Sequence, residues 1–253
     1  MVGMIGTAGS LLAAYSLAVL PGLVLILACF WLARIDTDPL LRIITLVLGF
    51  ILVRDAMTPA GLWDFGVVDG VVPWIRMTDN PVLLLALGIG SLILVAATLS
   101  DTSLRALVWW GKPNISTLLF GIGGALLVVA PIFAFTASQP IEVRGGVVAI
   151  TVLPALAFMT LAGNLLEEVL FRGYLQGRLV QVMTPVRAAV LSGMVFAACH
   201  VYLASTVTSV GWPLLAFTLW EGLICAVLRL RRGVIPAAVA HGLAIFLLAS
   251  GLV

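Results

Sequence analysis

The sequence predicts an all-α, polytopic integral membrane protein with about eight transmembrane helices. Of its 253 residues, 62% are hydrophobic and only 9% are charged, whereas roughly a quarter of the residues in ordinary soluble domains are charged. The apolar residues gather in runs of about 20, the length that a helix needs to cross a bilayer. The formal net charge of +2 is small and dispersed, so we expect a lipid bilayer around the protein and no nucleic acid partner.

Polar residues, prolines and glycines divide the chain into eight candidate spans. The first apolar run has no basic residues before it and is too long for a signal peptide, so we interpret it as a retained span. The second is the least secure, because Arg54 and Asp55 close it early. The spans are predicted at 10–33, 39–56, 81–99, 115–137, 147–170, 187–204, 211–230 and 233–252.

The segments between the spans predict the orientation. Segment 57–80 looks like an interfacial loop, with Trp63 and Trp74 at the level of the lipid headgroups. Alternate connections, beginning with the first, carry ten Arg or Lys residues, and the remaining connections carry three. The positive-inside rule therefore places the first set in the cytoplasm and both termini outside. Twelve arginines against one lysine favour a bacterial protein, so we expect the inner (cytoplasmic) membrane.

Several ionisable residues fall inside the predicted spans. Each costs roughly 3 kcal/mol or more at the bilayer centre unless it meets a partner or a cavity, so a function is the first hypothesis for it. Glu167, His200 and His241 lie at similar depths when they are counted from the nearest arginine at the cytoplasmic end of each helix, roughly 13 to 20 Å at about 1.5 Å per residue. The residues concerned are Glu167, Glu168, His200, Glu221 and His241.

Residue spacing separates the roles of the two adjacent glutamates. Glu168 and Arg172 are four residues apart, the favourable spacing for a helical ion pair, so we expect them to form a structural pair. Glu167 lies on another face of the helix and is left free to act as a base. His200 follows Phe196 by four residues, which places both rings on one face. Glu221 is interpreted as a helix-packing or cavity-lining group.

Three short motifs resemble those of a known family. Glu167-Glu168-Val-Leu-Phe-Arg172 matches EExxxR, Phe196-Ala-Ala-Cys-His200 matches FxxxH, and His241 stands where HxxxN begins. Their order and spacing resemble the CPBP (CAAX protease and bacteriocin-processing, or Abi) family of intramembrane proteases, which includes the Rce1-type prenyl endopeptidases. The resemblance covers roughly residues 145–253 and implies a catalytic core of four helices. We therefore divide the chain into N-terminal helices of unassigned role, 1–140, and a CPBP-like core, 141–253.

The resemblance also implies roles for individual residues. Glu167 would activate a water molecule, with His200 as its partner, and Glu168 with Arg172 would hold the site in shape. His241 would help to stabilise the oxyanion. The leading hypothesis is thus a metal-independent, cofactor-free endopeptidase that acts on a peptide or a membrane protein, in a cavity open toward the cytoplasm. Nothing in the sequence indicates whether the substrate is prenylated.

One departure from the family pattern keeps other hypotheses open. Ile245 replaces the asparagine of HxxxN, and losing one oxyanion donor typically costs about 10²–10³ in rate. Asn164, one turn before the two glutamates, is a candidate replacement. The alternatives are a catalytically impaired member acting as a membrane scaffold or immunity factor, a zinc metalloprotease using Glu167, His200 and His241, and a proton-relay transporter. The zinc hypothesis ranks lower because the sequence has no HExxH motif.

Overall fold

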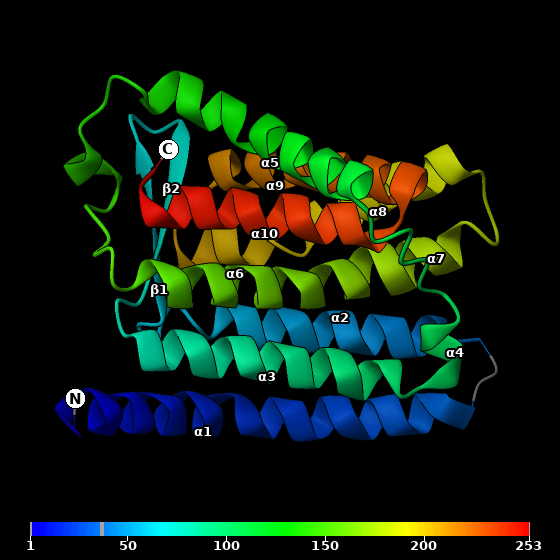
Figure 1. Ribbon diagram of the computed structural model, residues 1–253. Helices are drawn as coiled ribbons and strands as arrows, with labels where there is room; N and C mark the ends of the chain where they lie inside the picture. The colour runs from blue at the N-terminus through cyan, green and yellow to red at the C-terminus, as the bar shows by residue number, and fades with distance from the viewer. Residues whose placement is uncertain (1, 36–37, 253) are drawn as a thin grey trace.

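The computed structural model describes residues 2–35 and 38–252 as a helical bundle with one small hairpin. The all-α, multi-pass fold class is confirmed, since the bundle consists of long apolar helices running back and forth (Figure 1). Among the described residues, six helices are long and apolar enough to cross a membrane. The predicted spans 39–56 and 233–252 form shorter helices of 16 and 17 residues.

The N-terminal half contributes helices that begin at clear sequence signals. Asn80, Asp101 and Asn114 each accept hydrogen bonds from the first turn of the following helix, which satisfies N–H groups that have no partner within the helix. The elements are α1 (Val2–Leu32), η1 (Ala33–Ile35), α2 (Leu40–Asp55), α3 (Pro81–Leu99), α4 (Thr102–Arg105) and α5 (Ile115–Thr136).

The C-terminal half departs from regular α-helix at two places. The helix that carries the two glutamates starts at Leu153, later than predicted, and continues directly into the π-helical η3. A second π-helical segment, η4, follows His200. Such π segments are rare and are frequent at functional sites. The elements are η2 (Ile141–Arg144), α6 (Leu153–Glu168), η3 (Val169–Leu175), α7 (Gln176–Leu179), α8 (Pro185–Ala198), η4 (Leu203–Val207), α9 (Trp212–Arg232) and α10 (Val234–Ser250).

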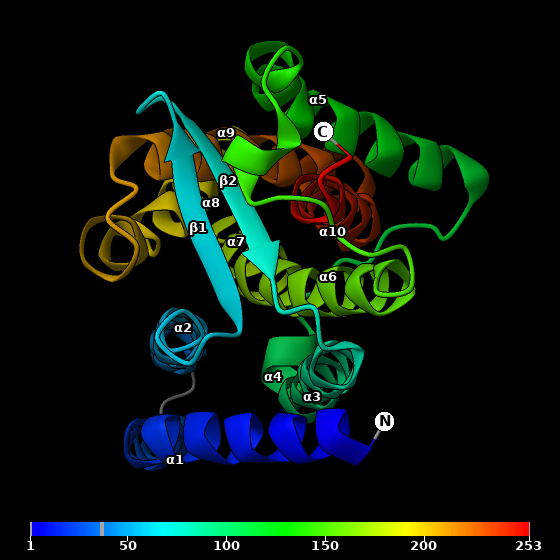
Figure 2. The same ribbon diagram turned by 90° about the vertical axis from the view of Figure 1, so that its left-hand side faces the viewer.

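The segment predicted as an interfacial loop, 57–80, is instead an antiparallel hairpin of β1 (Trp63–Val68) and β2 (Val72–Met77). Asp69 and Gly70 form its turn with φ of 51° and 70°, as a type I′ turn requires, and Asp-Gly between apolar runs is a strong hairpin signal. Arg76 Nη1 donates to the carbonyl of Leu248 at 2.7 Å and so ties β2 to α10. The hairpin lies across one end of the bundle (Figure 2).

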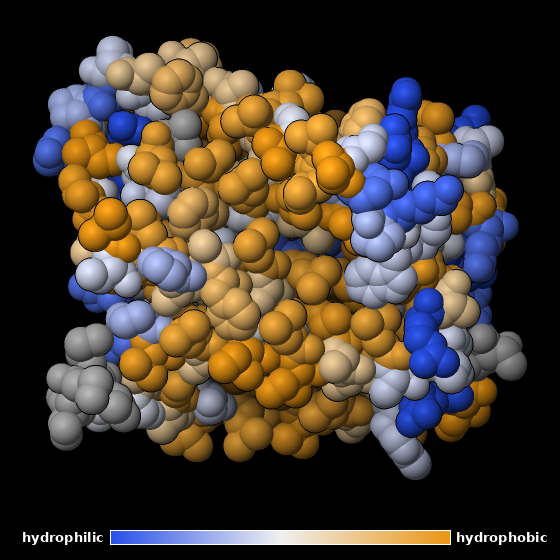
Figure 3. All heavy atoms as spheres, in the orientation of Figure 1, coloured by the Kyte–Doolittle hydropathy of each residue, from blue (hydrophilic) through white to orange (hydrophobic). Residues whose placement is uncertain are grey.

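The surface agrees with a protein that spans a membrane. Figure 3 shows an apolar band across the middle of one face of the molecule, with polar residues gathered toward its two ends. The hairpin lies at one end, together with the start of α1 and the end of α10, whereas α4 and α7 lie at the other (Figure 1). The second end carries Arg105 in α4 and Arg178 in α7, so below we call it the arginine-rich end.

Helices α6 and α10 approach closely because a glycine stands where they cross. A Cβ atom added to Gly242 would lie 2.9 Å from Leu161 Cα and 3.2 Å from the Thr160 carbonyl oxygen. Backbone atoms cannot move aside as the end of a flexible side chain can. Gly242 therefore sets the distance between α6, which carries the two glutamates, and α10, which carries His241.

We expect Gly242→Ala to separate these two helices and to destabilise the protein by about 1–3 kcal/mol, the usual effect of overpacking. Gly123→Ala is the matched control, because a Cβ on Gly123 in α5 would meet nothing within 4 Å. Melting temperatures of both variants in detergent would test this. Equal melting temperatures for the two variants would contradict the proposed constraint.

Candidate active site

One cavity gathers the ionisable residues that the sequence placed at similar depth. Glu167 from α6, His200 at the end of α8 and His241 from α10 all line it, together with Ile245 and Asn164. The cavity has about 90 Å³ of free space, enough for a few water molecules. Its other polar or charged lining residues are Arg54, Thr218 and Glu221.

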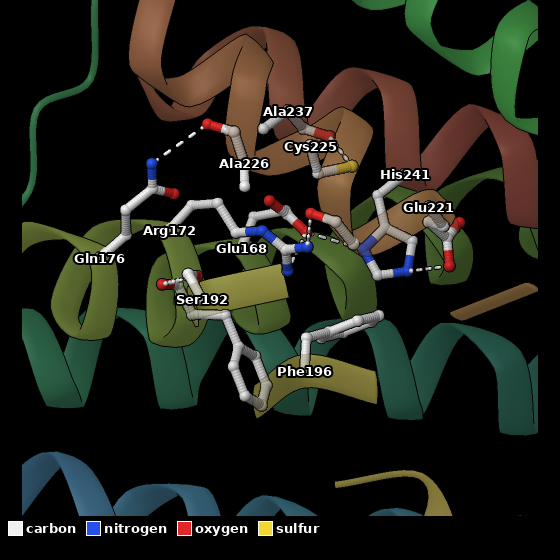
Figure 4. Close-up of polar contacts among 12 residues, drawn as sticks. Glu168, Arg172, Gln176, Ser192, Phe196, Glu221, Cys225, Ala226, Ala237 and His241 are labelled. Atoms are coloured by element: carbon white, nitrogen blue, oxygen red, sulfur yellow. Dashed lines mark hydrogen bonds and ion pairs between the residues drawn. The ribbon is translucent and has the colours of Figure 1, made fainter. Parts of the chain in front are cut away.

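Behind this cavity lies a fully buried ion pair. Glu168 Oε1 is 3.0 Å from Arg172 Nη1, and both side chains are 0% exposed, so the pair expected from the four-residue spacing is present. The same carboxylate oxygen lies 2.9 Å from Nδ1 of His241. Because a carboxylate only accepts hydrogen bonds, His241 donates its Nδ1–H to Glu168. One oxygen atom thus links α10 to the π-helical turn that carries Arg172 (Figure 4).

Arg172 extends this link to α9. Its Nη2 donates to the carbonyl oxygen of Gly222 at 2.8 Å, and its own carbonyl accepts from Arg229 Nε at 3.0 Å. Its guanidinium also lies over the ring of Phe196, 4.5 Å from the centroid. Arg172 therefore holds α9 and α8 against the helix of the two glutamates.

The ring of Phe196 lies at the centre of the site. Its centroid is 4.7 Å from that of His200, 5.5 Å from that of His241 and 5.1 Å from that of Phe171. The contact between Phe196 and His200 is the one that their four-residue spacing predicted. The contact with His241 comes from another helix, so Phe196 separates the two imidazoles as well as orienting one of them.

His200 has a defined hydrogen-bonding arrangement. Its Nδ1 lies 2.8 Å from the backbone carbonyl oxygen of Phe196. A carbonyl only accepts, so Nδ1 carries the hydrogen and Nε2 keeps its lone pair. The side chain is buried at 7% exposure and lines the cavity. His200 can therefore accept a hydrogen bond from a water molecule that also meets Glu167.

Glu221 belongs to the site, although it lies in none of the three motifs. Its Oε2 is 3.5 Å from Nε2 of His241, so the imidazole lies between two carboxylates, those of Glu168 and Glu221 (Figure 4). Its Oε1 is buried and has no hydrogen-bond partner among the described residues. Both interpretations from the sequence are confirmed, since Glu221 lines the cavity and contacts His241 of another helix.

Arg54 was missed as a site residue. It was interpreted as the charge that closes the second span, but it lines the cavity and is 4% exposed. Its Nη2 donates to the carbonyl oxygen of Cys199 at 2.7 Å, next to His200. The sequence did contain a signal for this role. Arg54 and Asp55 are charged residues at the end of a predicted span, and the positive-inside rule predicts that this end lies away from the cytoplasm. Helix α2, from the half of unassigned role, thus contributes to the cavity.

Asn164 does not present its amide freely to the cavity. Its Nδ2 donates to the carbonyl oxygen of Thr160 at 2.7 Å, one turn back on the same helix. Ile245 lines the cavity from α10, where the family pattern has asparagine. One of the two N–H groups of the amide that the sequence proposed as a substitute is therefore engaged with its own backbone.

The residues whose ligand atoms could hold a metal ion differ from those of the zinc hypothesis. Within residues 2–35 and 38–252, the compact group is Glu168, Cys225 and His241, with ligand atoms within 4.8 Å of one another. Two of these residues already have partners, because Glu168 Oε1 meets Arg172 and His241. The zinc hypothesis combined Glu167, His200 and His241, which share the cavity but do not form such a group.

The cavity extends toward the hairpin. Trp63 and Phe65 of β1 and Trp74 and Ile75 of β2 line it, and the hairpin lies at the end opposite α4 and α7 (Figure 1). The opening toward the cytoplasm that the sequence predicts stays a prediction.

Removing Arg172 should destabilise the protein strongly. In Arg172→Met the carboxylate of Glu168 stays buried without its cation, a loss of about 3–5 kcal/mol. Arg178→Met is the control, because Arg178 pairs with Asp38 at 2.7 Å where the side chains are 20% and 40% exposed, and such pairs contribute less than about 1 kcal/mol. The free energy of unfolding of both variants can be measured in detergent micelles. Equal decreases for the two variants would show that burial does not strengthen the pair of Glu168 and Arg172.

Comparison with known families identifies the C-terminal part of the chain. Residues 149–247 match the family described as type II CAAX prenyl endopeptidase Rce1-like. No curated protein and no solved structure gives a significant match. The matched residues include all three motifs, from Glu167 to Arg172, from Phe196 to His200, and at His241. The family resemblance predicted from these motifs is therefore confirmed, and residues 149–247 of this multi-pass membrane protein carry an Rce1-like, CAAX-protease-type domain.

Proposed function

We propose that this protein is an intramembrane endopeptidase in which Glu167 activates a water molecule for attack on a peptide bond. The observation that carries the proposal is that Glu167 and His200, from two different helices, line one cavity with room for water. His200 has a lone pair left for that water, because its Nδ1 is engaged by Phe196. The match to the Rce1-like family supports the general activity, which is that of a CAAX-type protease.

In the proposed reaction, Glu167 removes a proton from water while His200 Nε2 accepts the other hydrogen in a hydrogen bond. The hydroxide oxygen bonds to the carbonyl carbon of the peptide, and the carbonyl oxygen becomes negative. The C–N bond then breaks, and the amine leaves with the proton that Glu167 returns. One water is consumed, and the products are a carboxylic acid and an amine.

The remaining motif residues act by position in this proposal. Glu168 and Arg172 hold α6, α9 and α10 together through the contacts at 3.0, 2.9 and 2.8 Å. His241 is oriented by Glu168, and with a proton on Nε2 it adds a donor to the cavity lining. Glu221, 3.5 Å from that nitrogen, favours this proton when it is ionised. His241 would then stabilise negative charge on the substrate, as the family resemblance implies.

We further propose that the arginine-rich end faces the cytoplasm of a bacterial inner membrane, as the positive-inside rule indicates. The hairpin and the part of the cavity that it lines would then face the opposite side. The substrate would be a peptide or a membrane protein that reaches Glu167 past the apolar side chains of β1 and β2.

Replacing Glu167 by Gln should abolish cleavage of a peptide substrate by the purified protein, a loss of at least about 10²-fold, because an amide cannot take the proton. His200→Ala should lose activity similarly. Glu142→Gln changes an exposed glutamate outside the cavity and should leave the rate unchanged. Unchanged cleavage by Glu167→Gln protein would overturn the assignment. Activity lost to a chelator and restored by Zn²⁺ would instead support a metalloprotease.

The position of Ile245 in the cavity also favours a second candidate function, that of a catalytically impaired scaffold. Under that hypothesis cleavage is undetectable in the wild-type protein, and binding to a partner protein survives Glu167→Gln. Loss of partner binding on this substitution would count against it. The same set of variants therefore separates the two candidates.

Orientation can be tested with single cysteines in a cysteine-free background. Asp64 in the hairpin and Arg105 in α4 are both exposed and lie at opposite ends of the bundle. We expect a membrane-impermeant maleimide to label Asp64→Cys protein in intact cells and Arg105→Cys protein only after permeabilisation. The reverse pattern would place the hairpin in the cytoplasm.

A further inference from the structure

We infer that Arg54, which lies outside the matched family segment, donates a hydrogen bond to the negative oxygen that forms on the scissile carbonyl. It would thereby fulfil the role that the motif asparagine cannot have here, since Ile245 occupies that position. The inference rests on the proposed function and adds a residue of α2 to its catalytic groups.

The first argument is an unpaired donor. Arg54 is only 4% exposed and lines the cavity. Its Nη1 atom is buried and has no hydrogen-bond partner within the described part of the chain. A buried donor without a partner is unfavourable, and more so when it is charged. Such a cost in the wall of a cavity is explained if a ligand oxygen supplies the missing acceptor.

The second argument is that the rest of the guanidinium is held in place. Nε donates to Asp55 Oδ1 at 2.7 Å, Nη2 donates to the Cys199 carbonyl at 2.7 Å, and the group lies over Phe50, 4.7 Å from the ring centroid. The charge is therefore paired with Asp55, as burial requires. A donor that is already positioned does not have to reorganise when charge develops, which is what makes oxyanion stabilisation effective.

The third argument is location. The carbonyl that anchors Arg54 belongs to Cys199, the residue before His200. Phe50, which lies one turn before Arg54 on α2, also contacts the ring of His200, at 6.3 Å between centroids. Arg54 is thus fixed beside the histidine that would hold the attacking water. A carbonyl that meets this water would bring its oxygen close to the same wall of the cavity.

Other donors of the cavity lining are less suitable. Thr218 Oγ1 donates its only hydrogen to the Leu215 carbonyl, whereas Asn164 Nδ2 donates one of its two N–H groups to the Thr160 carbonyl and is neutral. Trp63 Nε1 is a second buried donor without a partner among the residues described. It is neutral and comes from the hairpin, whereas Arg54 is charged and anchored next to His200. Trp63 is therefore the competing candidate that an experiment has to separate from Arg54.

The kinetic experiment uses the full-length protein in detergent. The double variant Arg54→Gln/Asp55→Asn removes both charges of the pair, so no carboxylate is left buried alone. We expect kcat to fall about 10²–10³-fold, as for other oxyanion donors, with KM within twofold of wild type. Adding Ile245→Asn to the double variant should raise its kcat at least tenfold. Arg54→Lys, which keeps the charge beside Asp55, is the second variant if the double variant does not fold.

Two control variants make the result specific. Arg42→Gln removes another buried arginine of α2, which pairs with Asp101 at 2.7 Å and does not line the cavity, and it should leave kcat unchanged. Trp63→Phe removes the competing donor and should lower kcat at least tenfold less than the Arg54 variants do. A rise in KM alone in the Arg54 variants would make Arg54 a group that binds a substrate carboxylate and would overturn the inference, as would a larger effect of Trp63→Phe.

A binding measurement separates this inference from the proposed function. A peptide phosphinate carries a tetrahedral centre with a negative oxygen, and the matched ketomethylene peptide does not. Wild-type protein should bind the phosphinate more tightly than the ketomethylene peptide. In Arg54→Gln/Asp55→Asn or Arg54→Lys protein, the ratio of the two dissociation constants should fall at least tenfold. If wild-type protein cleaves nothing but shows this Arg54-dependent preference, the proposed function fails and the anion site stands. A preference that is absent, or that does not depend on Arg54, overturns the inference.

Discussion

The carboxylate of Glu168 is the group on which the rest of the site depends. It is fully buried, and one of its oxygens meets both Arg172 and His241. Burying a charge in this way is tolerated only where partners with good geometry surround it. The requirement therefore holds three helices in register: α6 with its π-helical continuation, α10 through His241, and α9 through the bond from Arg172 to Gly222. The cavity with Glu167 lies against this framework.

The different roles of the two adjacent glutamates follow from helix geometry. Glu167 and Glu168 are neighbours in sequence, but side chains one residue apart point about 100° away from each other on a helix. Glu168 faces the packed interior of the C-terminal helices, whereas Glu167 lines the cavity. A charged pair that stabilises the fold and a free carboxylate that can take a proton are thus available from one turn, with Phe196 packed between the two histidines.

Elements outside the family match complete the cavity. Arg54 from α2 and the aromatic residues of the hairpin line it, and β2 is tied to α10 by Arg76. The N-terminal helices are therefore more than a membrane anchor for residues 149–247. Together with the hairpin they line the cavity at the end opposite the arginine-rich one, and α2 brings a buried guanidinium beside His200. The division into a core at 141–253 and helices of unassigned role remains a prediction about folding units.

The sequence by itself determined the membrane fold and the family, because apolar runs of helical length and motifs spaced along single helices are local properties. It also determined the pair of Glu168 and Arg172, which are neighbours on one helix. Only the tertiary structure decided that Arg54 and Glu221 join the motif residues and that a hairpin lies over the cavity. These depend on contacts between segments up to 172 residues apart, and no periodicity within one segment encodes which distant side chain will be its partner.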